Sequence, residues 1–170
     1  GEIFDLIFEI IKKYQIIEKN IPIILDPVMF AKGGFPLLEN QAISALKEFI
    51  KQVDCILTPN IPEAETLSGL KILNKNDMIK AAKNINTRGK PRILLKGGHL
   101  NRTDLCDILY DKNSIFELYS KKIDTNNTHG TGCTISSAIT ANLSKGLSLY
   151  ESVSIAHEYV HKSILKAPNL

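Results

Sequence analysis

Residues 21–26 read IPIILD, a short apolar run that ends in an acidic residue and is followed by Pro27. Two further runs of this kind occur downstream, DCILT at residues 54–58 and RILLK at residues 92–96. Each run is too apolar to leave one face in water, which is typical of strands buried on both faces. Because segments with helical periodicity separate the runs, the sequence predicts an α/β layered fold with a mainly parallel central sheet.

The remaining predicted elements are helices and one hairpin. The first helix is amphipathic, and its predicted inner face comprises Ile3, Phe4, Ile7, Phe8, Ile11 and Tyr14. Three further helices are predicted next: one over residues 39–51, one with Pro62 in its first turn, and one capped by Asn76 or Asp77 that runs to about residue 86. An antiparallel hairpin of DLCDILY and IFELYS, joined by DKNS, follows them. The last two predicted helices are one from Cys133 to Lys145, stopped by Gly146, and one that opens with a capping box at Ser148 and Glu151.

The bulk composition narrows the class of protein. A chain of 170 residues with a 44% hydrophobic share fits one domain with a sizeable core. It contains no apolar run long enough to span a membrane, and nothing near its start resembles a signal peptide. A net charge of +3 does not point to nucleic-acid binding. The three cysteines are odd in number and widely spaced, which suits a reducing cytosol.

Polar side chains follow each of the three predicted strands. Asp26 follows the first, Asn60 and Glu63 follow the second, and Lys96 begins a glycine turn after the third. Any one of them is more often a turn former or a helix cap than a ligand-binding residue. Parallel strands end at one edge of a sheet, however, and open α/β sheets bind ligands there. Carboxylates suit magnesium and lysine suits phosphate, so the set predicts a site for a magnesium–phosphate group.

Residues 124–140, DTNNTHGTGCTISSAIT, supply a second phosphate-binding feature. Gly130 and Gly132 precede a predicted helix, whose free amide groups attract anions. Neither a Walker A loop nor a dinucleotide-binding fingerprint is present. Cys133 lies on the first turn, where a lowered pKa would make it a base or nucleophile. The residues alone leave open whether Cys133 has that role or is a small buried hydrophobe.

Two histidines, His157 and His161, lie one turn apart on the last predicted helix. Such a pair can bind a metal ion, but no third ligand is close in sequence. Packing in the core or on the surface is the favoured interpretation of both.

Four motifs occur in order along the chain: DPVMFAKGG at residues 26–34, LTPNIPEAETLSG at 57–69, LLKGGHL at 94–100 and HGTGCTISSAITA at 129–141. Together they resemble the hydroxymethylpyrimidine/phosphomethylpyrimidine kinases, the thiamine-pathway members of the ribokinase-like superfamily. Sugar kinases and many pyridoxal kinases of that superfamily usually carry Asp at the position of Cys133. The resemblance implies a ribokinase-like three-layer α/β/α fold, with helices on both faces of the sheet.

The resemblance also implies an activity and its site. The activity is ATP-dependent phosphorylation of 4-amino-5-hydroxymethyl-2-methylpyrimidine and then of its monophosphate, in thiamine diphosphate biosynthesis. The implied catalytic groups are Cys133, as the base facing the substrate, and Lys96 with the amides around Gly130 and Gly132, which act on the moving phosphoryl group. The implied ATP-binding residues are Asn60, Lys96, Gly97, Thr131 and Gly132. The resemblance further implies that Asp26 and Glu63 bind magnesium and that Val28 lies against the pyrimidine.

The ends of the chain depart from the family pattern. We expect residues 1–170 to form a single ribokinase-like kinase domain without the family's N-terminal strands and substrate loop. Two alternatives stay open, a pyridoxal kinase-like activity and an inactive fragment or remnant. The resemblance further implies a cytoplasmic protein that forms a homodimer if the chain is complete, with small-molecule ligands and no nucleic-acid or membrane partner.

Overall fold

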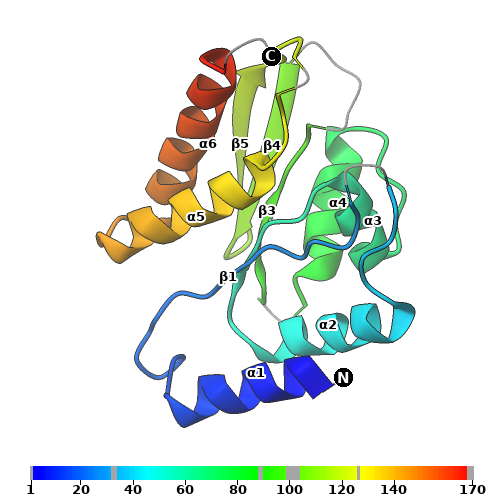
Figure 1. Cartoon of the computed structure of the whole chain (residues 1–170), viewed down its shortest axis with the longest axis vertical. Helices are drawn as coiled ribbons and strands as arrows, with labels where there is room; N and C mark the ends of the chain where they lie inside the picture. The colour runs from blue at the N-terminus through cyan, green and yellow to red at the C-terminus, as the bar shows by residue number, and fades with distance from the viewer. Residues whose placement is uncertain (1, 32–33, 88–89, 99–103, 126, 168–170) are drawn as a thin grey trace.

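The computed structural model describes residues 2–31, 34–87, 90–98, 104–125 and 127–167. Helices and three short strands make up the first part of these residues, and a hairpin and two helices complete them (Figure 1). The elements are α1 (Glu2–Lys13), β1 (Ile24–Leu25), α2 (Asn40–Gln52), β2 (Ile56–Leu57), α3 (Ile61–Ser68), α4 (Lys75–Ile85), β3 (Arg92–Leu95), β4 (Asp104–Asp111), β5 (Ser114–Lys121), α5 (Thr131–Ser144) and α6 (Leu149–Leu165).

The five strands of the described residues form one sheet in the order β1-β2-β3-β4-β5. β1, β2 and β3 pair in parallel, whereas β4 runs antiparallel to both β3 and β5. Four of the five strands therefore point the same way, and the prediction of a mainly parallel sheet is confirmed. The predicted hairpin is confirmed too: Lys112 and Asn113 turn between β4 and β5 with φ values of +46° and +68°, as a tight two-residue turn requires.

β1 and β2 are shorter than the apolar runs that predicted them. Only two residues of each strand form a regular ladder, although the amide of Thr58 also donates to Leu25 O at 3.1 Å. Among the strands of the described residues, β1 has a partner on one side only, and Ile24 and Leu25 are partly exposed. An apolar run thus marked the position of a strand but overstated its length.

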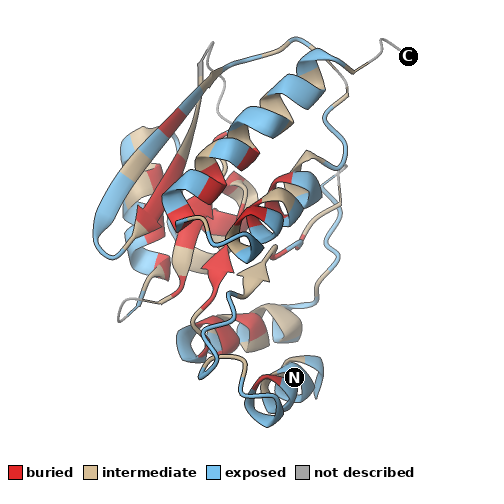
Figure 2. Cartoon of the chain, turned by 90° about the vertical axis from the view of Figure 1, so that its left-hand side faces the viewer, coloured by how far each residue is buried: buried red, intermediate tan, exposed pale blue. Residues whose placement is uncertain are grey.

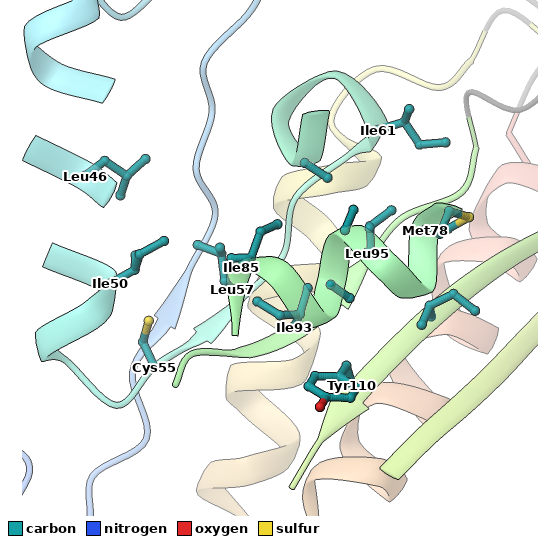
Figure 3. Close-up of a cluster of buried hydrophobic side chains, with 14 of the residues drawn as sticks. Leu46, Ile50, Cys55, Leu57, Ile61, Met78, Ile85, Ile93, Leu95 and Tyr110 are labelled. Atoms are coloured by element: carbon teal, nitrogen blue, oxygen red, sulfur yellow. The ribbon is translucent and has the colours of Figure 1, made fainter. Parts of the chain in front are cut away.

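Helices cover both faces of the sheet, which confirms the three-layer prediction (Figures 1 and 2). Successive strand residues point to opposite faces, so Ile93 and Leu95 join one core and Leu94 joins the other. The first core receives side chains from α1 to α4, including Leu46, Ile61 and Met78 (Figure 3). The second receives side chains from α5 and α6, such as Ile139 and Val153.

Two helix starts differ from the predictions. α4 begins earlier than expected because Asn74, rather than Asn76 or Asp77, is its cap: Asn74 Oδ1 accepts from the amide of Asp77 at 3.1 Å. α5 begins at Thr131 with Gly130 as its N-cap, two residues before Cys133. Gly130 has a φ of +76°, a conformation that glycine adopts without strain.

The other predicted helix ends agree with the structure to within one residue. α3 has Pro62 in its first turn, and α6 opens on the Ser148–Glu151 capping box. α2 is shifted by one residue at each end relative to the expected 39–51. Gly146, with a φ of +84°, follows the end of α5.

α1 buries only part of its predicted face. Phe4, Phe8 and Ile11 pack toward the core, and the Phe4 ring lies 5.5 Å from that of Phe49 on α2. Ile3, Ile7 and Tyr14 are exposed instead. The prediction of a single inner face was therefore too wide, because α1 packs chiefly against one helix. None of the described helices is both long and apolar enough to cross a membrane.

Candidate active site

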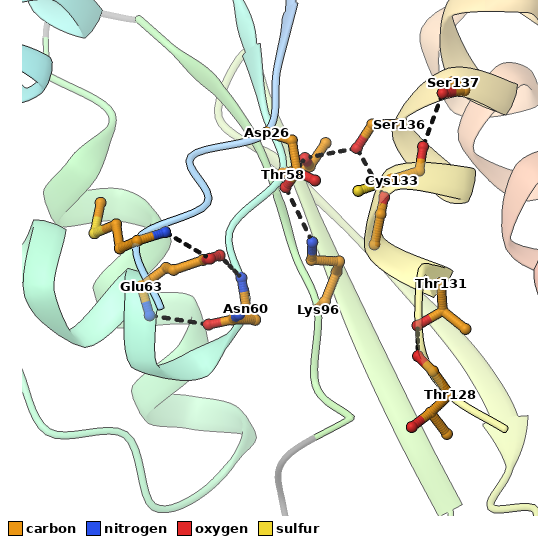
Figure 4. A network of polar contacts seen from close by, with 12 residues as sticks. Asp26, Thr58, Asn60, Glu63, Lys96, Thr128, Thr131, Cys133, Ser136 and Ser137 are labelled. Atoms are coloured by element: carbon orange, nitrogen blue, oxygen red, sulfur yellow. Dashed lines mark hydrogen bonds and ion pairs between the residues drawn. The ribbon is translucent and has the colours of Figure 1, made fainter. Parts of the chain in front are cut away.

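The side chains that follow the three parallel strands meet at one edge of the sheet, beside α5 (Figure 4). Lys96 Nζ lies 3.3 Å from Asp26 Oδ1, and each side chain is 17% exposed. The backbone of Asn60 bridges in parallel to that of Lys96. The alternation of strand side chains explains the meeting: Asp26 and Lys96 each lie two residues after a core residue that faces α5, Ile24 and Leu94.

The first turn of α5 faces this ion pair. A side chain at Gly132 would begin only 3.2 Å from Lys96 Nζ and 3.8 Å from Asp26 Oδ2, so the helix backbone lies directly against both groups. The amides of a first turn have no partner within the helix and lie at the positive end of its dipole. Cys133 is exposed on the same turn, and its side chain points to the side where Asp26 and Thr58 lie (Figure 4). An anion could therefore bind between Lys96 and the helix amides, next to a thiol.

Glu63 is held inside the site by backbone hydrogen bonds. Its Oε2 accepts from the amide of Asn60 at 2.8 Å and its Oε1 from that of Met29 at 3.4 Å, while Asn60 Oδ1 accepts from the amide of Glu63 at 3.0 Å. Burial raises the pKa of Glu63, and these amides and the Lys96 charge act in the opposite direction. Glu63 is 2% exposed. Its hydrogen bonds to the amides of Met29 and Asn60 tie the segment after β1 to the start of α3. Val28, next to Met29, is 44% exposed.

A cavity of about 170 Å³ continues from Lys96 and Gly132 toward the hairpin and α6. Its walls are largely apolar, and Thr131 lines its entrance from α5 with its hydroxyl donating to Thr128 O at 2.9 Å. The lining residues are Lys96, Gly98, Leu105, Asp107, Ser120, Lys121, Ile123, Thr128, Thr131, Gly132, Ile135, His157, Val160, His161 and Ile164. The cavity therefore joins a largely apolar wall to the ammonium group of Lys96.

Asp107 organises the floor of the cavity. Its Oδ1 accepts from the amide of Gly97 at 2.7 Å, and its Oδ2 lies 3.8 Å from His157 Nε2. Burial raises the pKa of Asp107, whereas the Gly97 amide, His157 and Lys96 oppose that rise. The Nε2 atom of His161 lies 3.1 Å from the backbone oxygen of Lys121. Both histidines thus pack into the fold at the cavity, in line with the favoured interpretation.

The structure brings the predicted residues together and adds three that sequence reasoning missed. Asp26, Lys96, Gly132 and Cys133 share one edge of the sheet, and Asn60 and Glu63 adjoin it. Lys32, Gly33 and His99, which belong to the quoted motifs, lie outside the described residues. The missed residues are Thr58, Ser136 and Asp107. Only the position of Thr58 at a strand end could have indicated one of them.

The described side chains fit magnesium only as part of a shared coordination sphere. They contain no cluster of three or more His, Cys, Asp or Glu groups that could hold a metal ion. Asp26 offers Oδ2, which none of the described residues hydrogen-bonds, whereas both oxygens of Glu63 already accept from backbone amides. Magnesium commonly takes one or two carboxylates and completes its shell with phosphates and water. The described side chains fit that use, and Asp26 is the carboxylate that could hold the ion.

The comparisons with known proteins agree with this geometry. The family model for phosphomethylpyrimidine kinase matches residues 2–170. The chain therefore belongs to the phosphomethylpyrimidine kinase family. It is 41% identical over 152 residues to a protein of Haemophilus influenzae named hydroxymethylpyrimidine/phosphomethylpyrimidine kinase, an alignment that covers 87% of this chain and 56% of the relative.

Two solved structures have the same fold. Phosphomethylpyrimidine kinase from Clostridium difficile 630 superposes with a TM-score of 0.77 at 38% identity, covering 96% of this chain and 64% of the other. Pyridoxal kinase from Bacillus subtilis, in an ADP complex, gives a TM-score of 0.85 at 33% identity, covering 99% and 61%. The fold is thus that of the ribokinase-like vitamin kinases. The present chain spans somewhat more than half the length of the Haemophilus relative and of both solved chains.

Proposed function

We propose that this chain carries the catalytic machinery for ATP-dependent phosphorylation of 4-amino-5-hydroxymethyl-2-methylpyrimidine and then of its monophosphate. One observation carries the proposal: the Lys96–Asp26 pair lies against the first turn of α5, which also holds Cys133. Phosphoryl transfer needs mostly positioning and charge stabilisation. A lysine, free helix amides and a carboxylate supply both in one place. The name of the Haemophilus relative supports the choice of substrate.

The nucleotide binds along the cavity in this proposal. Its phosphates lie against the amides of residues 130–133 and the ammonium of Lys96, with Asn60 and Gly97 beside them. Thr131 and Gly132 form the rim between the phosphates and the apolar wall, where the base lies. Helix amides and Lys96 are fixed before ATP arrives, so they stabilise the charge of the transferring group without reorganising.

Magnesium has its place at Asp26 in this scheme. When bound, the ion supplies charge neutralisation and orientation of the phosphates. Asp26, through Oδ2, would hold the ion, and Glu63 would support it by holding the segment after β1 in place. Of the chain's own groups, Lys96 keeps Asp26 oriented through Oδ1.

Cys133 acts as the base in the first transfer. As a thiolate, Cys133 takes the proton of the substrate hydroxyl and becomes a thiol, while the new O–P bond forms and the bond from the γ-phosphorus to the departing ADP oxygen breaks. Val28, exposed at the end of β1, packs against the pyrimidine and sets its distance from Cys133. In the second transfer the acceptor is the phosphate of the monophosphate, which carries no hydroxyl of this kind.

Purified protein with Mg-ATP and the hydroxymethylpyrimidine tests the proposal directly. We expect mass spectrometry to detect the mono- and diphosphate, and Lys96→Ala to slow their formation. If the protein alone gives no product, the assay is repeated with a separately expressed N-terminal segment of a full-length relative. Absence of product in both assays would refute the proposed activity.

Pyridoxal phosphorylation is the second candidate function. It is favoured by the TM-score of 0.85 to the pyridoxal kinase of Bacillus subtilis, over 99% of this chain. A competition assay with equal concentrations of pyridoxal and the pyrimidine separates the two. We expect the pyrimidine to be phosphorylated faster, and preferential consumption of pyridoxal would reverse the assignment.

We also propose that the protein is a cytoplasmic homodimer. The free thiols of Cys55, Cys106 and Cys133 suit a reducing compartment. The family resemblance supports the dimer. Light scattering coupled to size-exclusion chromatography should give twice the chain mass of 18.9 kDa, and a mass of one chain would exclude the dimer.

A further inference from the structure

We propose that a buried hydroxyl bridge between Thr58 and Ser136 positions the phosphoryl-transfer site by holding the first turn of α5 against the Asp26–Lys96 pair. The inference rests on the proposed function, because it concerns how the groups of the same site are held in position relative to one another. Thr58 and Ser136 are positioning residues in this account, and neither is assigned contact with substrate.

The bridge connects the strands to the helix through short hydrogen bonds. Thr58 Oγ1 lies 2.9 Å from Ser136 Oγ and 3.1 Å from Asp26 Oδ1 (Figure 4). Ser136 Oγ also lies 3.1 Å from the carbonyl oxygen of Gly132. Thr58 is fully buried and Ser136 is 8% exposed, so water does not compete freely for these bonds. A continuous chain of contacts therefore runs from Gly132 through Ser136 and Thr58 to Asp26.

The number of hydroxyl hydrogens determines which group donates and which accepts along the bridge. Each hydroxyl has one hydrogen to donate and two lone pairs to accept. If Thr58 donates to Asp26, Ser136 must donate to Thr58. In the opposite order Ser136 donates to Gly132 O, Thr58 donates to Ser136, and Asp26 loses its hydroxyl donor. Hydrogen bonds to a charged acceptor are the stronger ones, so the carboxylate selects the order that runs from α5 to Asp26.

This order also fixes the orientation of Asp26. Oδ1 accepts from both Thr58 Oγ1 and Lys96 Nζ, at 3.1 and 3.3 Å. Oδ2 is left on the side of Gly132. Without the Thr58 hydroxyl, Lys96 alone would set the carboxylate's rotation. The bridge therefore aligns both the helix amides and the free carboxylate oxygen with the phosphate position.

Apolar packing alone would not give this alignment. Ile135 and Ile139 attach α5 to the sheet through the second core, and the hydrophobic effect has no preferred direction. Hydrogen bonds depend steeply on distance and angle, so they select one axial position of the helix among those that bury the same residues.

Substitutions that delete one hydroxyl test the bridge. Thr58→Val keeps the side-chain shape, and Ser136→Ala removes the helix end of the bridge. We expect each to lower kcat by about 10-fold or more, with a change in the KM for ATP below about 3-fold. A small displacement of the first turn of α5 weakens stabilisation of the transition state more than it weakens ATP binding. The double variant should be no slower than the worse single one, because the two hydroxyls act as a unit. Thr58→Ser should restore most of kcat.

Ser137→Ala is the matched control. Ser137 is exposed, and its hydroxyl donates to Cys133 O at 2.8 Å, but among the described residues it makes no hydrogen bond to a strand or strand end. We expect its kcat to equal that of the wild type. Equal kcat values for Ser136→Ala and Ser137→Ala, or full activity of folded Thr58→Val, would overturn the inference.

A crystal structure gives a readout that does not depend on turnover. In the Thr58→Val, Ser136→Ala double variant we expect the Gly132 backbone to lie farther from Lys96 Nζ than in the wild type. An unchanged first turn would overturn the inference even if the wild type were inactive. By contrast, an inactive wild type with a displaced first turn in the double variant would refute the proposed function and leave the bridge intact.

Discussion

At the scale of single residues, two glycines show how closely the site is packed. A side chain on Gly97 would begin 2.0 Å from the carbonyl oxygen of Cys106, a backbone atom that cannot move aside without shifting β4. Gly98, one residue further, has no atom of the described residues within 4 Å of the point where its side chain would begin. Gly97 is therefore required by close approach, and it places the turn after Lys96 against the strand.

Gly97→Ala should lower the free energy of unfolding by about 1–3 kcal/mol or more, the usual cost of overpacking a tight site. Gly98→Ala should change it by less than about 0.5 kcal/mol, as expected where no neighbour is displaced. Urea unfolding of the two variants measures the difference. Equal stabilities would show that the turn does not press on β4.

Asp107 gives a pH-dependent prediction at the same scale. Its pKa is raised by burial, so the native state binds this proton more tightly than the unfolded chain does. The free energy of unfolding then falls as the pH rises from the usual carboxyl pKa of about 4 through the folded value. Asn at this position keeps an oxygen for the Gly97 amide but cannot ionise.

We therefore expect Asp107→Asn to gain stability relative to the wild type as the pH rises through that interval. Thermal unfolding at a series of pH values measures the gain. Asp5→Asn, on the exposed surface of α1, is the control. A constant difference in Tm between Asp107→Asn and the wild type would contradict the assignment.

At the scale of elements, hydrophobic period and strand ends were informative and exact boundaries were not. The three apolar runs located the parallel strands, and the polar residues after them met as expected around Asp26 and Lys96. The sequence could not distinguish Asn74 from Asn76 as the cap of α4, because either can accept from an amide three residues on. Ser136 and Asp107 were missed because each lies within an element, where nothing local marks a polar contact across the fold.

The cap of α4 can be tested with a matched pair. Asn74→Ala should cost about 1 kcal/mol of unfolding free energy, the usual loss for an N-cap side chain. Asn76→Ala, inside the first turn, should cost less than about 0.5 kcal/mol. Chemical unfolding monitored by circular dichroism measures both, and the reverse order would restore the cap predicted from the sequence.

At the scale of the whole molecule, apolar surface remains exposed on α1. Ile3, Leu6 and Ile10 are each more than two-fifths exposed, whereas Phe4 packs on Phe49. The amphipathic pattern predicted the helix but too wide a covered face, because the number of covered residues depends on how many elements pack around the helix. Exposed apolar patches of this kind favour association.

Leu6→Lys should therefore reduce self-association without lowering Tm. Phe4→Ala should lower the free energy of unfolding by about 3 kcal/mol, near the lower end for loss of a packed aromatic ring. Light scattering across a concentration series and thermal unfolding separate the two effects. Unchanged scattering for Leu6→Lys would show that this face does not drive association.

In the proposed mechanism, Cys133 acts as a base beside a phosphate site made of backbone amides and Lys96. Cys133→Ala tests it most directly, with transfer to the hydroxymethylpyrimidine and ADP affinity measured on the same protein. We predict that transfer falls by about 100-fold or more, as for loss of a general base, while the Kd for ADP changes by less than about 3-fold because the phosphate contacts are retained. Full activity of the variant, or loss of ADP binding together with activity, would contradict the account.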